Sequence, residues 1–113
     1  MAKHILMAFS NPRPGTDADF NKWYDEIHLQ EILAVKGYVS AQRFYVSEAQ
    51  MLGRAEPMHK YLTIYEIETD DLKQTLADLN EAARHMKVDP SVDRGNALAG
   101  VFHAIGERVV PAS

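Results

Sequence analysis

The 113-residue sequence contains no cysteine. The absence of thiols excludes a disulfide framework, thiol catalysis and cysteine-ligated metal centres. Runs of basic residues are also missing and the formal net charge is −4, so the chain is a poor candidate for binding nucleic acid or an anionic membrane. No apolar run approaches the roughly 20 residues of a membrane span. The stretch 1–15 lacks the long apolar core of a signal peptide. We therefore expect a cytoplasmic protein.

The short motifs of several cofactor and hydrolase classes are absent as well. The sequence has no glycine-rich phosphate loop, no dinucleotide fingerprint, no nucleophile-elbow serine and no HExxH pair. Its five histidines are scattered, so we expect neither a structural metal nor a cofactor. The one metal-ligand set left open is His28, Glu31 and His103.

What is present is an ordinary globular composition, with 46% hydrophobic and 25% charged residues. This length suits one domain with one core over residues 1–113. Hydrophobic periodicity and turn signals predict six elements. The predicted strands are 3–9, 38–48, 59–68 and a segment within 97–109, and the predicted helices are 17–35 and 72–87.

The order β-α-β-β-α-β is that of the α+β ferredoxin-like sandwich, a four-stranded antiparallel sheet with two helices on one face. In strand 38–48, simple alternation places Tyr38, Ser40, Gln42, Phe44 and Val46 together. The last predicted segment contains Gly100 and Gly106, two candidate weak or bulged points. Both faces of the predicted strands 38–48 and 59–68 carry apolar or aromatic residues, so we expect a second copy to cover the open face as a twofold homodimer.

The first helix carries the clearest sign of a site. Phe20, Trp23, Tyr24 and Ile27 have the spacing of one apolar stripe. A straight helix would then bring Glu31 into the middle of that stripe, where an unpaired carboxylate is costly. We therefore expect the helix to bend or restart near His28.

His28 is the leading candidate for catalysis. An imidazole titrates near neutrality and moves a proton in either direction. Glu31 is near enough in sequence to orient it, and Asp25 is a second candidate for that role. The structural alternative is a histidine that only caps or pins the bend. Trp23 and Tyr24 could line a flat pocket or simply pack in the core.

Four residues outside the first helix are candidates for binding a substrate. Tyr61 and Tyr65 share one face of their strand and could bind a carbonyl or phenol, or stack across the dimer. Arg43 could bind a carboxylate, but an ion pair with Glu66 across the hairpin is the favoured interpretation. His103 faces either the pocket of His28 or the dimer core.

These residues carry a resemblance to a known family. The pattern F-x-x-W-Y-x-x-x-H-x-x-E-I-L-x-x-x-G after a first strand resembles the EthD-like branch of the dimeric α+β barrel superfamily. Its residues here are Phe20, Trp23, Tyr24, His28, Glu31, Ile32, Leu33 and Gly37. Related members often carry a proline shortly after the histidine, where this chain has Leu29-Gln30.

The resemblance implies a dimeric α/β barrel with one pocket in each subunit. It also implies a small cofactor-independent enzyme, of isomerase, dehydratase/lyase or monooxygenase type. The implied ligand is a small aromatic, polyketide-like or lactone compound, with His28 as general acid/base. Two alternatives stay open: a non-catalytic protein that binds a hydrophobic ligand, and a haem-handling member of the same fold.

Overall fold

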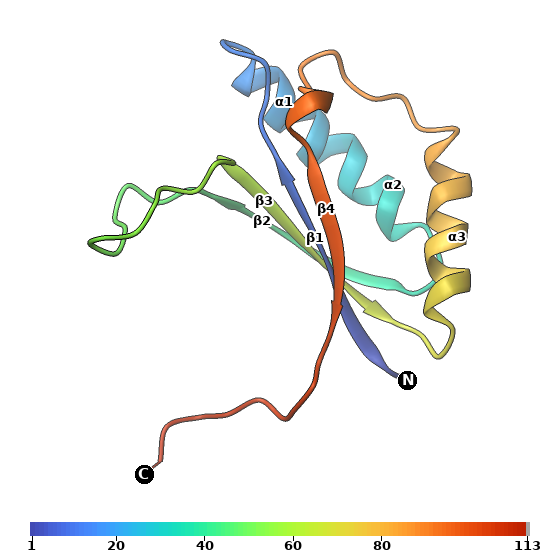
Figure 1. The fold of residues 1–113 in the computed structure, drawn as a ribbon. Helices are drawn as coiled ribbons and strands as arrows, with labels where there is room; N and C mark the ends of the chain where they lie inside the picture. The colour runs from blue at the N-terminus through green and yellow to red at the C-terminus, as the bar shows by residue number, and fades with distance from the viewer. Residues whose placement is uncertain (113) are drawn as a thin grey trace.

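The computed structural model describes residues 1–112 as a four-stranded antiparallel sheet that carries its helices on one face (Figure 1). The strands are β1 (Lys3–Ser10), β2 (Tyr38–Tyr45), β3 (Tyr61–Glu68) and β4 (Leu98–His103), in the order β2-β3-β1-β4. The helical elements are α1 (Asp17–Trp23), η1 (Tyr24–His28), α2 (Leu29–Leu33), α3 (Leu72–Ala83) and the short turn η2 (Arg94–Asn96). The predicted ferredoxin-like architecture is confirmed. No helix within residues 1–112 combines the length and apolar character needed to cross a membrane.

The first helix changes phase where the sequence predicts it. Residues Tyr24–His28 form a π-helical turn that joins α1 to α2 without a break. A π turn adds one residue to the helical repeat, so the buried stripe rotates around the helix axis. Phe20, Trp23 and Tyr24 are buried before the turn and Ile32 is buried after it. Ile27, predicted to lie in the stripe, is 51% exposed because the rotation carries it outward.

Local signals set the ends of both long helices. Gly37 follows α2 with a φ of +98°, a conformation that other residues adopt with strain. Asp71 precedes α3, and its carboxylate accepts a hydrogen bond of 3.1 Å from the backbone N–H of Gln74. The prediction that this helix reaches Lys87 is wrong, since α3 ends at Ala83.

A bulge in β2 changes which side chains share a face. The β2–β3 register shifts between Tyr38 and Ser40, so Val39 is the extra residue. The predicted grouping of Tyr38 with Ser40 is therefore wrong: Tyr38 points to the helices and packs in the core. Gly100, by contrast, stays in regular register opposite Met7. The strand also ends at Tyr45 rather than at the predicted Glu48.

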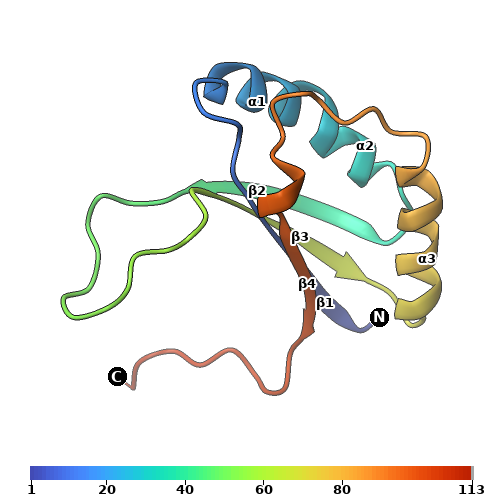
Figure 2. The same cartoon turned by 45° about the horizontal axis from the view of Figure 1, so that its top comes forward.

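The helices cover one face of the sheet and leave the other exposed to solvent. Tyr61, Tyr65 and Ile67 of β3 are buried under the helices. The opposite face leaves large apolar side chains exposed, among them Phe44 and Phe102. Figure 2 shows the connection between β2 and β3 and the segment after β4 extending away from the helical layer. The core therefore lies between sheet and helices, and the candidate site lies in that layer.

Candidate functional site

A cavity of about 370 Å³ lies between the first helix and the sheet. Three parts of the chain form its walls: residues 8–10 of β1, one face of α1 and η1, and parts of the segment 88–99 that leads into β4. Its polar lining residues are Ser10, His28 and Arg94. Trp23 and Tyr24 add aromatic surface that carries an N–H or O–H group. A mostly apolar hollow with a small number of polar groups is the usual form of a small-molecule site.

His28 ends the π turn and forms part of the cavity wall. Its ring stacks on Trp23 with centroids 4.5 Å apart and planes 20° apart. The Tyr24 ring meets it edge-on at 5.0 Å. The side chain of His28 keeps 20% of its surface exposed. Two aromatic rings therefore fix the plane of the imidazole while part of it stays accessible.

Glu31 lies beside the same imidazole. The Nδ1 atom of His28 is 3.6 Å from Glu31 Oε1, slightly longer than a hydrogen bond, and both atoms are buried. Burial lowers the pKa of His28 below its usual 6.5, and the Glu31 carboxylate opposes that shift without overcoming it. This lowered pKa favours the neutral form of the imidazole at pH 7. With Nδ1 turned toward Glu31, Nε2 is the nitrogen open to a ligand.

Trp23 and Tyr24 also line the cavity, as their place beside His28 predicts. They belong to one buried cluster with Phe20 and Tyr61. The indole N–H of Trp23 is buried and has no hydrogen-bond partner within residues 1–112. Trp23 and Tyr24 therefore pack in the core and also form part of the cavity wall, so both positions considered from the sequence apply to them.

Arg43 lies behind this aromatic wall rather than in the cavity. Its guanidinium donates to Asp25 Oδ1 at 2.8 Å and to Asn21 Oδ1 at 2.9 Å, and it lies 4.5 Å above the centroid of the Tyr24 ring. The predicted ion pair with Glu66 is wrong. Glu66 projects from the opposite face of the sheet, where it accepts a hydrogen bond from Ser40.

The two candidate tyrosines of β3 are also outside the His28 cavity. Tyr61 lines a separate, open hollow of about 380 Å³ with Arg43, and its hydroxyl donates to Asp17 at 2.9 Å. The Tyr65 hydroxyl is buried near Tyr24, but it has no hydrogen-bond partner of good geometry among the described residues. Burial, reinforced by the nearby Tyr24, raises the pKa of Tyr65 far above its usual value.

His103 is the candidate that the fold separates most clearly from His28. It pairs across the sheet with His4, and the two rings meet edge-on at 6.3 Å. Its side chain is exposed and does not line the cavity. In the described part of the chain, no three His, Asp or Glu side chains gather as metal ligands would. His28, Glu31 and His103 therefore do not form a joint ligand set.

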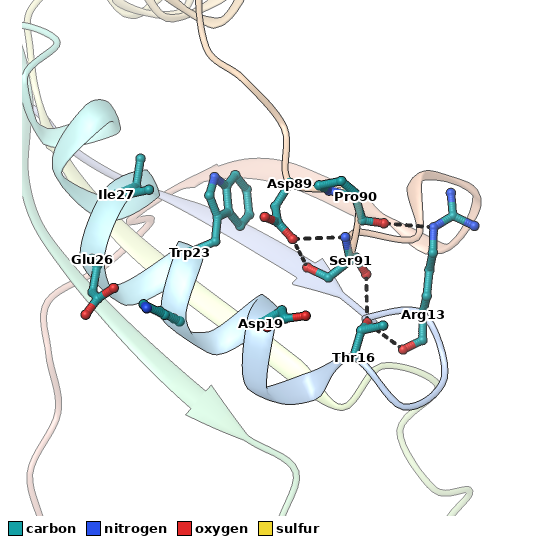
Figure 3. A pocket seen from close by; sticks show the side chains of 10 residues that line it. Arg13, Thr16, Asp19, Trp23, Glu26, Ile27, Asp89, Pro90 and Ser91 are labelled. Atoms are coloured by element: carbon teal, nitrogen blue, oxygen red, sulfur yellow. Dashed lines mark hydrogen bonds between the residues drawn. The ribbon is translucent and has the colours of Figure 1, made fainter.

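A second cavity, of about 610 Å³, lies on the outer side of Trp23 (Figure 3). The segment 89–91 faces α1 across it. Arg13 Nε donates to the Pro90 carbonyl at 2.9 Å, and Ser91 donates to Asp89, which lowers the pKa of that carboxyl. Sequence reasoning missed this cavity and the contribution of Arg94 to the first one, because VDPSVDRG carries only loop signals.

Comparison with known proteins gives matches to solved structures alone. No protein-family model and no curated protein matches this chain. A haem-degrading protein, MhuD, from Mycobacterium tuberculosis is 13% identical with a TM-score of 0.63, over 94% of this chain and 99% of that one. SnoaB, a cofactor-independent oxygenase from Streptomyces nogalater, is 12% identical with a TM-score of 0.59, over 95% and 97%.

A protein of the ethyl tert-butyl ether D (EthD) family from Bacillus halodurans is 12% identical with a TM-score of 0.57. The match covers 96% of this chain and 100% of that one. At such identities a match shows the fold alone. The EthD-like resemblance is thus confirmed at the level of the fold.

Proposed function

We propose that the chain is a small cofactor-independent enzyme, of isomerase, dehydratase/lyase or monooxygenase type, with His28 as its general acid/base. The substrate is a small aromatic, polyketide-like or lactone compound bound in the adjacent cavity. The observation that supports this most strongly is geometric: an imidazole stacked on Trp23 and 3.6 Å from Glu31 forms part of the wall of an apolar cavity of about 370 Å³. That volume lies in the range of roughly 300–1,000 Å³ that holds small-molecule ligands.

The carboxylate of Glu31 determines which ring nitrogen of His28 carries the proton. It favours a proton on Nδ1, which leaves the lone pair on Nε2 to take a proton from the substrate. Once Nε2 is protonated, the same carboxylate stabilises the imidazolium. Removal of a proton next to a carbonyl group gives an enolate. That intermediate can be reprotonated elsewhere, expel a leaving group, or react with dioxygen as co-substrate.

The other candidates have supporting roles in this proposal. Trp23 and Tyr24 offer aromatic surface to a flat substrate. Arg43 and Tyr61 support that aromatic wall from behind, because Arg43 stacks over Tyr24 and Tyr61 packs in the same cluster. Tyr65 belongs to the neighbouring core cluster with Ile32 and Ile67. His103 has no part in the chemistry, since it lies outside the cavity.

The test compares two histidine variants on a substrate found by screening aromatic and polyketide-like compounds for turnover by mass spectrometry. His28→Ala is expected to lower kcat by about 100-fold or more, as loss of a general base does. His85→Ala is the matched control, because His85 is 76% exposed and contacts only Glu81 among charged groups. Unchanged turnover by His28→Ala would remove His28 from the mechanism.

Two alternatives use the same cavity. A non-catalytic protein would bind hydrophobic compounds without turning any of them over, and His28→Ala would leave binding intact. A haem-handling protein is favoured by the similarity to MhuD and by the open Nε2 of His28, which is a suitable iron ligand. Titration with haemin separates this case, because a Soret shift that His28→Ala abolishes would indicate iron ligation.

We also propose that the exposed sheet face binds a second copy of the chain. Phe44, Leu98 and Phe102 leave this face apolar, and monomers rarely expose large apolar patches. Phe102→Glu should therefore shift the protein to monomer in sedimentation equilibrium. Ile27→Glu is the control, since Ile27 is about as exposed (51% against 55%) but lies on the helical side. A monomeric parent protein would refute the dimer.

A further inference from the structure

Arg94 is the one permanently charged side chain among the residues that line the His28 cavity. It lies in η2, on the segment between α3 and β4, and its side chain is exposed. The other lining residues are apolar, aromatic or neutral polar groups. A ligand in this cavity would therefore meet neutral walls inside and one cation where the cavity opens to solvent.

The guanidinium of Arg94 is not occupied by the protein itself. It forms no ion pair and no hydrogen bond within the part of the chain that the structure describes. The adjacent carboxylate of Asp93 is engaged elsewhere: it accepts from the backbone N–H of Gly95 at 3.2 Å and from Asn96 Nδ2 at 2.6 Å. Asp93 therefore stabilises the turn itself and does not form an ion pair with Arg94.

Arg43 shows the contrast. Both of its terminal nitrogens are held, one by Asp25 and the other by Asn21, and the group is stacked over Tyr24. Its remaining donor, Nε, is buried and cannot reach a ligand in the His28 cavity, which Arg43 does not line. Of the two arginines near the site, only Arg94 keeps free donors beside the His28 cavity. A guanidinium with two parallel N–H groups matches a planar carboxylate in geometry as well as in charge.

We infer that Arg94 binds a carboxylate of the substrate, so that the substrate class is a small apolar or aromatic carboxylic acid. This inference rests on the function proposed above for the His28 cavity. The apolar body lies against Trp23 and His28 while the carboxylate stays at the solvent-facing rim. Arg94 thereby acts in specificity and orientation, not in the proton transfer.

The test measures binding of two probes of the same shape by isothermal titration calorimetry, the anion 2-naphthoate and the neutral 2-naphthamide. The parent protein should bind the carboxylate about fivefold more tightly, the contribution of an exposed ion pair of about 1 kcal/mol. Arg94→Gln should abolish this preference. Arg54→Gln should keep it, since Arg54 is an exposed arginine in the distant β2–β3 connection (Figure 1). About 0.5 M NaCl should weaken the carboxylate preference alone.

The outcomes separate this inference from the proposed function. Binding of both probes with equal affinity by the parent protein overturns the role of Arg94 and leaves the cavity as the ligand site. Equal loss of both probes in Arg94→Gln, restored in Arg94→Lys, also overturns it, because it assigns the residue a packing role. Failure of both probes to bind the parent protein contradicts the proposed function itself.

Discussion

Removal of the hydroxyl oxygen from two buried tyrosines, Tyr65 and Tyr38, should change the stability of the fold in opposite directions. The Tyr65 side chain is 2% exposed, and its hydroxyl has no hydrogen-bond partner among the described residues. The Tyr38 hydroxyl, also buried, donates to the backbone carbonyl of Thr75 at 3.2 Å. An unpaired buried hydroxyl costs about 1–3 kcal/mol, whereas a buried hydrogen bond contributes about 1 kcal/mol.

Tyr65→Phe should therefore raise the free energy of unfolding by about 1 kcal/mol, and Tyr38→Phe should lower it by about 1 kcal/mol. In a domain of this size each change moves Tm by about 4 °C. Urea denaturation followed by Trp23 fluorescence measures both, since Trp23 is the one tryptophan in the sequence. A loss of stability in Tyr65→Phe would instead mean that this hydroxyl has a partner, either Tyr24 or a bound water.

Three further predictions concern the helices and the site. Gly37→Ala should destabilise by about 2–3 kcal/mol in urea denaturation, because φ is +98° and a Cβ atom would lie 3.0 Å from Thr75 Cγ2. Gly15→Ala, with φ of +80° and no atom within 4 Å, should cost only about 1 kcal/mol. Asp71→Ala should cost about 1 kcal/mol through loss of the α3 cap, seen as a lower Tm. Since burial lowers the pKa of His28, the unfolded chain binds a proton more readily below pH 6.5, and stability should fall as pH drops from 6.5 toward the folded pKa. His28→Gln should remove that part of the pH dependence.

The sequence predicts the fold and the phase break because both depend on local periodicity. The apolar spacing of Phe20, Trp23 and Tyr24 conflicts with that of Ile32 on any straight helix. The π turn resolves the conflict by adding one residue to the repeat. The same logic places His28 beside Trp23 and Tyr24 and brings Glu31 within reach.

What the sequence does not predict depends on contacts between distant segments. The bulge at Val39 has no glycine or proline to signal it, and it alone turns Tyr38 toward the helices. Arg43 pairs with Asp25 because the first helix brings η1 near β2, which no local pattern reveals. Arg94 reaches the cavity because the segment after α3 folds back over the first helix, although its sequence indicates only a loop.

The protonation state of the His28 imidazole decides whether this residue can act as the base of the proposed reaction. An NMR titration of the 15N-labelled protein, following both ring nitrogens of His28, measures it. We expect a pKa below 6.5, with the proton of the neutral ring on Nδ1 beside Glu31 and Nε2 unprotonated. A pKa at or above 6.5, or a neutral ring with its proton on Nε2, would contradict the claim that His28 is a buried base facing the cavity.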